Sequence, residues 1–178
     1  DALGNLVDAA VGQRLRTLFD RYLGDDWQTN TADPASWEGV RSIPNGELWA
    51  ARSAAREHLI EYVREKNQQD RLLRGEQIDY VRSVETLLDP NVLTLGFARR
   101  LATYKRLHLL AQDPERARRI MNGPRPVQLL VAGKAHPADG PGKDTLQRLY
   151  NLKREENSFA ARLIFVEDYD LAVAKQLV

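Results

Sequence analysis

Three short, nearly continuous apolar runs in the second half of the chain constrain the fold more than any other feature of the sequence. They are Val92–Ala98, Val127–Ala132 and Arg162–Val166. Short apolar runs rich in branched residues are typical of strands that are buried on both faces of a parallel sheet. Stretches of helical character follow or separate them, at about 104–112, 114–121 and 143–155. This order predicts a doubly wound α/β arrangement with right-handed crossovers.

The first half of the chain has the helical period instead. Apolar residues recur at intervals of three and four from Leu3 to Leu23, and Gly24 follows as a stop signal. Asp33 and Pro34 are positioned to begin a short helix. Two longer helices are predicted, at about 47–73 and 77–88.

The chain therefore divides into a helical lead-in, residues 1–90, and the first half of an α/β domain, residues 91–178. The lead-in carries 11 basic and 16 acidic side chains and the α/β part 15 and 9, so the net charge of +1 combines −5 and +6. Three strands are few for such a sheet, and the amphipathic pattern after Asp170 reaches Val178 without a cap. We therefore expect the chain to be a piece of a longer protein. The sheet of such a piece has an unpaired edge, which favours self-association.

Composition excludes several classes of function. The 178 residues are 43% hydrophobic, enough for an ordinary core, and they include no cysteine, which excludes disulfides and thiolate chemistry and indicates a cytoplasmic protein. No apolar run approaches the roughly 20 residues of a membrane span, so no membrane partner is expected. Aromatic residues are not interleaved with basic ones, which argues against nucleic acid. The histidines lack ligand spacing, so no metal site is predicted; they are His58, His108 and His136.

Polar residues follow each predicted strand, at the sheet edge where open α/β sheets bind ligands. Cations beside the N-termini of the following helices form an anion site, for which phosphate is the obvious ligand. We call the segment that follows each strand its exit. The exit of the first strand contains Arg99-Arg100 and Lys105-Arg106, that of the second Gly133-Lys134, and that of the third Glu167-Asp168-Tyr169.

Plainer interpretations of the same residues stay open. The basic cluster after the first strand would also serve as a solvated helix start, and Lys134 as a partner of Asp139. Glu167 and Asp168 are adjacent on an extended segment and point in opposite directions, so a shared proton is not expected. The loop at 140–144 lacks the Ser or Thr that a nucleotide-binding P-loop needs, and no dinucleotide fingerprint follows any strand.

Motifs at these positions resemble one family. The runs Leu95–Arg106, Ala132–Asp139 and Ile164–Asp170 are similar to the bacterial α-glucan (glycogen/maltodextrin) phosphorylases, and Leu18–Gly24 and Glu47–Trp49 resemble the start of that family's C-terminal domain. The resemblance spans nearly the whole chain, which itself resembles only a central slice of the enzyme. It implies a helical segment followed by a partial Rossmann-like parallel sheet, half of the C-terminal domain of a two-domain glycosyltransferase.

The resemblance also implies an activity. In the family, inorganic phosphate attacks the terminal glucose of an α-1,4-glucan and glucose 1-phosphate is released, with pyridoxal 5′-phosphate acting through its phosphate. By position in the motifs, Arg100 and Lys105 resemble catalytic residues; the residues that resemble cofactor-binding ones are Arg99, Lys105, Lys134 and Tyr169. The family's Schiff-base lysine lies downstream of Val178. We therefore expect this chain alone to hold no covalent cofactor and to lack phosphorolytic activity.

Two other functions are compatible with the residues taken by themselves. A nucleotide-sugar glycosyltransferase similar to glycogen synthase would use cations at the same edge for a diphosphate. A non-catalytic anion-binding module would require protected sheet edges. A glycine-rich segment with a lysine beyond Val178 favours the phosphorylase, and a carboxylate motif there favours the sugar-nucleotide enzyme.

Overall fold

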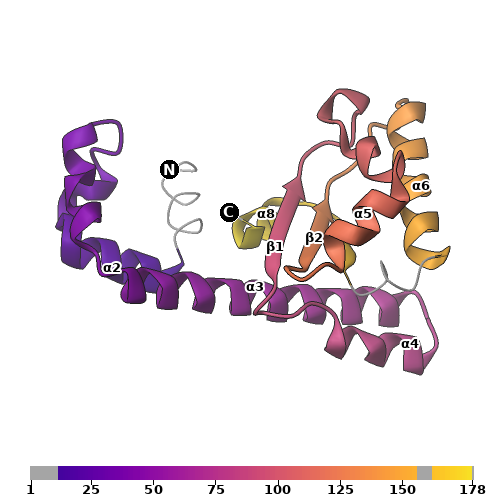
Figure 1. The fold of residues 1–178 in the computed structure, drawn as a ribbon, viewed down its shortest axis with the longest axis horizontal. Coiled ribbons are helices and arrows are strands. Elements are labelled where there is room, and N and C mark those ends of the chain that lie inside the picture. The colour runs from indigo at the N-terminus through magenta and orange to yellow at the C-terminus, as the bar shows by residue number, and fades with distance from the viewer. Residues whose placement is uncertain (1–11, 156–161, 178) are drawn as a thin grey trace. The chain divides into compact units, whose positions relative to one another are not determined.

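The computed structural model describes residues 12–155 and 162–177 (Figure 1). The described chain forms two compact units, residues 12–59 and residues 60–177. The beginning of the helix predicted from Leu3 lies outside the described residues, and the described part of it is helical.

The first unit consists of helices. They are α2 (Gln13–Leu23), the 3-10 helices η1 (Asp25–Gln28) and η2 (Pro34–Ser42), and the first part of α3 (Asn45–Leu73). The short helix predicted after Asp33 is confirmed as η2, and the Asp33 carboxylate accepts a hydrogen bond from the backbone N–H of Ala35 at 3.0 Å. Leu18, Ile43 and Ala51 are buried together as the core of this unit.

The second unit contains the rest of α3 and the whole sheet. Its further elements are α4 (Ile78–Arg82), η3 (Ser83–Thr86), β1 (Leu93–Ala98), η4 (Thr103–Lys105), η5 (Leu107–Ala111), α5 (Pro114–Met121), β2 (Val127–Ala132), α6 (Gly140–Glu155), β3 (Leu163–Val166) and α8 (Leu171–Leu177). The strands pair in parallel in the order β1-β2-β3. The predicted mixed α/β fold with a three-stranded parallel sheet is confirmed, and each strand matches its apolar run to within a residue.

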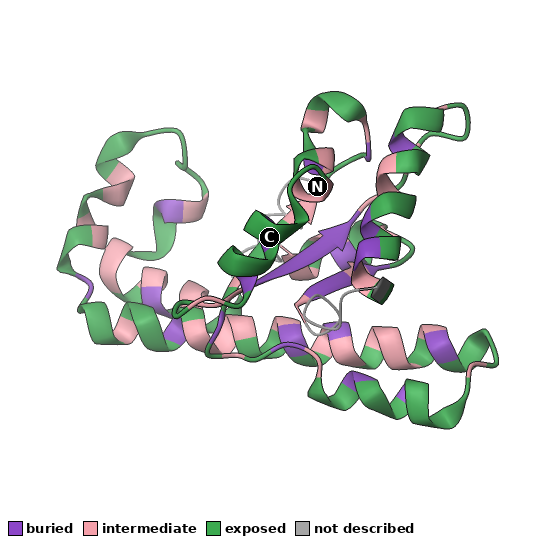
Figure 2. Cartoon of the chain, turned by 45° about the vertical axis from the view of Figure 1, so that its right-hand side comes forward, coloured by how far each residue is buried: buried purple, intermediate pink, exposed green. Residues whose placement is uncertain are grey.

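The main core of this unit lies on one face of the sheet, between the strands and the helices α5 and α6 (Figure 1). Leu129 and Leu163, which are register partners, pack there with Met121 of α5 and Leu149 of α6. The middle strand, which has a neighbour on each side, is buried from its second residue to its last (Figure 2). Burial of these apolar side chains is the main force that holds the sheet and its helices together.

One polar side chain is built into the centre of the sheet. Gln128 on β2 is 1% exposed, and its Oε1 accepts a hydrogen bond from the backbone N–H of Asp89 at 2.9 Å. Its Nε2 donates to the carbonyl of Asp89 at 2.9 Å and to Oγ1 of Thr94 at 2.8 Å. The buried amide is thereby satisfied, and it ties the turn before β1 to the middle strand.

Three predicted helices differ from the structure in detail. The stretch at 104–112 is two 3-10 helices, η4 and η5, because Arg106 between them has a left-handed backbone with φ of 61°. The stretch at 77–88 is the short α4 followed by η3. The helix predicted at 143–155 begins earlier, at Gly140. The Asp139 carboxylate accepts a hydrogen bond from the N–H of Gly142 at 2.9 Å and so caps the helix.

No helix among the described residues is long and apolar enough to cross a membrane.

Candidate functional site

The segments that leave β1 and β2 stay hydrogen-bonded to each other beyond the sheet. The N–H of Arg99 donates to the carbonyl of Ala132, and the N–H of Leu101 donates to the carbonyl of Lys134, both at 3.2 Å. The pairing brings the two arginines that follow β1 beside the lysine that follows β2. Three of the predicted phosphate-binding residues therefore lie on neighbouring stretches of backbone.

Two glycines allow the close approach of these segments. A Cβ at Gly133 would lie 2.0 Å from the carbonyl oxygen of Arg99, and a Cβ at Gly142 would lie 2.3 Å from the carbonyl oxygen of Leu101. Gly142 belongs to the first turn of α6, so the N-terminus of this 16-residue helix packs against the exit of β1. The positive end of the α6 dipole thus lies at the same edge as the arginines.

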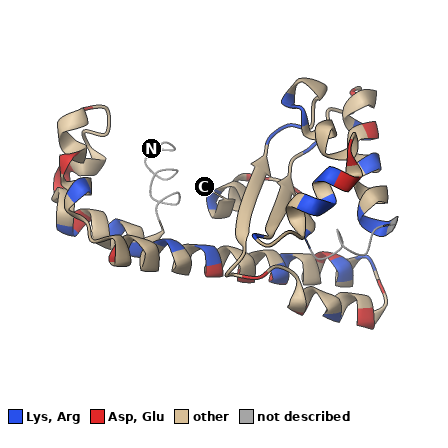
Figure 3. Cartoon of the chain, viewed as in Figure 1, with Lys and Arg blue, Asp and Glu red and all other residues tan. Residues whose placement is uncertain are grey.

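The side chains at this edge are mostly in contact with solvent. Arg99 and Arg100 are exposed, whereas Lys105 on η4 is half-buried with its Nζ 4.6 Å from the centre of the Tyr104 ring. Figure 3 shows basic positions in blue on the segment that leaves β1. Among the described residues, no carboxylate forms an ion pair with any of these three cations. Their charge is therefore available to an anionic ligand.

The exit of β3 contributes a carboxylate that meets Lys134. Nζ of Lys134 lies 3.5 Å from Oδ1 of Asp168, with the two side chains 61% and 81% exposed. The interpretation of Lys134 as the partner of Asp139 is wrong, because the Asp139 carboxylate caps α6 instead. Exposed ion pairs of this kind contribute at most about 1 kcal/mol, so a phosphate with two negative charges can displace the carboxylate.

The other carboxylate of this exit has a different partner. Oε2 of Glu167 accepts a hydrogen bond from Nη1 of Arg74 at 2.6 Å. The pKa of Arg74 is raised, chiefly by its hydrogen bond to Glu76 and further by the charge of Glu167. Glu167 and Asp168 thus engage different cations, Arg74 and Lys134.

Two more residues complete the end of β3. Tyr169 is half-buried, and the Asp170 carboxylate accepts a hydrogen bond from the N–H of Val173 at 2.9 Å. This bond lowers the pKa of Asp170, and the positive charges of Lys66 and Lys134 lower it further. The predicted capping of the last helix by Asp170 is confirmed.

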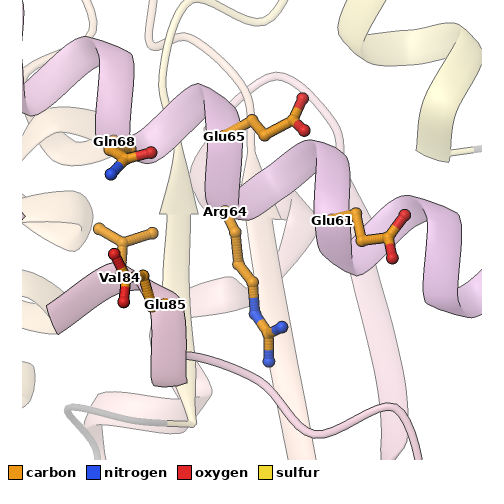
Figure 4. Close-up of a pocket in the computed structure, with 6 residues that line it drawn as sticks. All are labelled: Glu61, Arg64, Glu65, Gln68, Val84 and Glu85. Atoms are coloured by element: carbon orange, nitrogen blue, oxygen red, sulfur yellow. The ribbon is translucent and has the colours of Figure 1, made fainter. Parts of the chain in front are cut away.

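A cavity of about 240 Å³ lies elsewhere in the second unit, between α3 and η3 (Figure 4). Its lining residues are Glu61, Arg64, Glu65, Gln68, Val84 and Glu85. The guanidinium of Arg64 already donates to the carbonyls of Leu87 and Leu88, both at 2.8 Å. The remaining charges are acidic, so this cavity does not suit a phosphate. The described residues also contain no group of three or more side chains arranged to hold a metal ion.

We call the edge where Arg99, Arg100, Lys105 and Lys134 lie near the N-terminus of α6 the basic edge. Two of its features were not predicted from the sequence. The contact of Gly133 with the backbone of Arg99 had a signal, since a glycine at the end of a strand often marks the close approach of another backbone. The pairing of Lys134 with Asp168 had a signal too, because these residues follow the neighbouring strands β2 and β3.

The fold and this edge together define a class of protein. The chain is a partial Rossmann-like α/β domain, in which basic residues follow two neighbouring parallel strands and meet the N-terminus of a helix. Proteins of known function narrow the class further.

The chain is 39% identical over 165 residues to the glycogen phosphorylase of Aquifex aeolicus and 36% identical over 165 residues to the maltodextrin phosphorylase of Thermococcus litoralis. It is 40% identical over 146 residues to the glycogen phosphorylase of Mycobacterium bovis. These alignments cover 92%, 92% and 82% of the chain, but only 24%, 19% and 17% of the three relatives. No family model matches the chain. The predicted resemblance is confirmed: the chain matches a fragment of the α-glucan phosphorylases, and it spans about a quarter of their length or less.

Proposed function

We propose that Arg99, Arg100, Lys105 and Lys134 hold phosphate groups in an α-glucan phosphorylase, of which this chain is one part. The reaction is the release of glucose 1-phosphate from an α-1,4-glucan by inorganic phosphate, in glycogen or maltodextrin degradation. The main support for the proposal is that the segments after β1 and β2 remain hydrogen-bonded to each other, which places Arg99 and Arg100 beside Lys134. The names of the relatives support it, and they favour a phosphorylase over a sugar-nucleotide enzyme or a non-catalytic module.

The side chains at this edge fit the phosphate of pyridoxal 5′-phosphate. Guanidinium and ammonium groups form charge-assisted hydrogen bonds with phosphate oxygens, and these cations have no described carboxylate partner other than the exposed Asp168. Arg99, Lys105 and Lys134 would hold the phosphate of the cofactor, with Tyr169 beside its ring. When bound, the cofactor supplies a phosphate group that exchanges a proton with the substrate phosphate.

The cations of this chain would offset the repulsion between the cofactor phosphate and the substrate phosphate. Two unit charges 4 Å apart repel by about 4 kcal/mol at an effective dielectric constant of about 20, and two phosphates carry more than one charge each. Arg100 and Lys105 bind and orient the substrate phosphate, and the planar guanidinium of Arg100 can grip two of its oxygens. The N-terminus of α6 adds a favourable dipole. Because the backbone N–H groups at this terminus are held by the helix itself, their attraction is not lost to reorganisation.

Phosphate binding to the 178-residue chain tests this assignment. Titration with inorganic phosphate, followed by amide chemical shifts, is expected to move the signals of Arg99 to Lys105 and of Gly133 to Lys134. The double variant Arg99→Gln/Arg100→Gln is expected to weaken binding at least tenfold. Arg119→Gln, an exposed arginine on α5, is the matched control and leaves binding unchanged. Equal binding by the double variant and the control would contradict the proposal.

The complete enzyme requires more than this chain. We infer that the segments carrying the Schiff-base lysine and much of the glucan site belong to the rest of the phosphorylase, so the 178 residues alone neither form a cofactor imine nor release glucose 1-phosphate. A sequence without cysteine supports a cytoplasmic location for the enzyme.

A further inference from the structure

Arg106, the last residue of the basic run that follows β1, has an unusual backbone. Its φ of 61° and ψ of 17° lie in the left-handed region, which residues with a Cβ enter at an energetic cost. Among the described residues, two other non-glycine residues share this conformation, Leu88 and Asp168. Leu88 is 5% exposed in the core, and Asp168 has a short polar side chain that tolerates the conformation and pairs with Lys134. Burial and side-chain type thus account for these two residues but not for Arg106.

No contact of the Arg106 side chain offsets this cost. The residue is exposed, and among the residues that the structure describes no carboxylate forms an ion pair with its guanidinium. A glycine would adopt the same backbone without strain. Strained residues cluster at functional sites, so an arginine at a position that suits glycine better points to a function for its side chain.

The loop that carries Arg106 is held next to the basic edge at both ends. Leu101 before it and Leu107 after it are 3% and 7% exposed, and both belong to the core cluster that includes Leu149 of α6. The N–H of Leu101 also donates to the carbonyl of Lys134 at 3.2 Å. The loop is therefore fixed in place beside the exit of β2.

Hydrogen bonds within the loop hold its two cations together. The N–H of Lys105 donates to the carbonyl of Ala102 at 2.9 Å, and the N–H of Arg106 donates to the carbonyl of Thr103 at 3.0 Å. The left-handed residue ends η4 and begins η5, so Arg106 directly follows Lys105 in a closed turn. Two positive side chains on one short turn repel each other, and a shared anion relieves that repulsion.

We propose that Arg106 is a further phosphate-binding residue of the basic edge, an assignment that rests on the proposed function. Its guanidinium joins those of Arg99 and Arg100 and the ammonium groups of Lys105 and Lys134. A planar guanidinium binds two oxygens of one phosphate, which a single ammonium group cannot do with the same geometry. Because the turn is already formed, little backbone order has to be gained when phosphate binds.

The test compares phosphate binding with stability in the 178-residue chain. Arg106→Gly removes the guanidinium and leaves a residue that suits the observed backbone, so the urea midpoint is expected to stay the same or to rise. The dissociation constant of inorganic phosphate, measured from amide chemical shifts, is expected to rise about threefold or more, because a charge-assisted hydrogen bond is lost. Arg106→Lys keeps the charge and should bind phosphate more tightly than the glycine variant. Arg119→Gln, on the exposed face of α5, is the matched control and leaves phosphate binding unchanged.

Unchanged phosphate affinity in Arg106→Gly overturns the assignment of Arg106, and the double variant Arg99→Gln/Arg100→Gln shows whether the proposed function falls with it. If only the double variant binds weakly, the basic edge binds phosphate without Arg106. If the unchanged chain binds no phosphate, both proposals fail. A lower urea midpoint together with weaker binding in Arg106→Gly would show that Arg106 shapes the loop instead of holding phosphate, and it would also overturn the assignment.

Discussion

At the scale of single residues, the basic edge depends on a residue that has no side chain. Gly133 follows β2 directly, and the position of its missing Cβ is occupied by the backbone of Arg99. The arginines, the lysine and the α6 terminus meet because two backbones approach more closely than any side chain would permit. The geometry of the proposed phosphate site thus depends on a glycine as well as on the cations themselves.

We expect Gly133→Ala to damage the site. The new Cβ would lie 2.0 Å from the carbonyl oxygen of Arg99, so one of the two exits must shift, at a cost of about 1–3 kcal/mol in the free energy of unfolding. Phosphate binding is expected to weaken together with stability. Urea unfolding and a phosphate titration measure both. Gly140→Ala is the control, because a Cβ there meets no atom within 4 Å, and it should leave both quantities nearly unchanged.

Individual residues of the site were predictable to different degrees. Arg99, Arg100 and Lys134 could be assigned to one edge because parallel strands bring their carboxyl ends together. The partner of Lys134 could not, since Asp139 is close in sequence and Asp168 follows the neighbouring strand β3, so both are candidates. The structure decides between them because the Asp139 carboxylate caps α6.

At the scale of elements, the strands were predicted well and the connections less well. Apolar runs determine β1, β2 and β3 because both faces of a parallel sheet must be covered. The stretch 104–112 has a helical pattern but folds as η4 and η5, since the left-handed backbone at Arg106 interrupts it. That interruption places Lys105 on its own short helix next to the site, so the departure from the pattern belongs to the candidate site itself.

The cap of α8 gives this helix a dependence on pH. The hydrogen bond from the N–H of Val173 lowers the pKa of Asp170 below its ordinary value, with further lowering by Lys66 and Lys134. Because the folded pKa is below the unfolded one, the carboxylate stabilises the fold above the usual aspartate range, and this contribution is lost as the pH falls through the folded pKa. An NMR titration should show the Asp170 carboxyl and the Val173 amide moving together at a pH below the usual range. In Asp170→Asn the Val173 amide should lose that transition, and its persistence would assign the titration to another group.

At the scale of the whole chain, the change from helical to strand pattern in the sequence does not coincide with the boundary between the two compact units. The pattern changes near residue 90, yet residues 60–90 belong to the same compact unit as the sheet. The buried Gln128 shows the reason, because it binds both backbone groups of Asp89 and thereby joins the end of the helical part to the middle strand. A change of period marks where strands begin, but side chains across that point decide which residues pack together.

The outer edge of β1 leads to the last prediction. Among the described residues β1 pairs only with β2, and Leu93 and Leu95 on this strand are 60% and 48% exposed. An unpaired strand with exposed apolar side chains is a template for another strand, and in the isolated chain a second copy is the available partner. We expect concentration-dependent self-association, measured by sedimentation velocity, and we expect Leu95→Lys to suppress it because a charge on an edge strand opposes pairing. Leu73→Lys is the matched control, since Leu73 is 86% exposed but lies at the end of a helix. A chain that stays monomeric at high concentration, or equal suppression by both variants, would exclude the β1 edge as the contact.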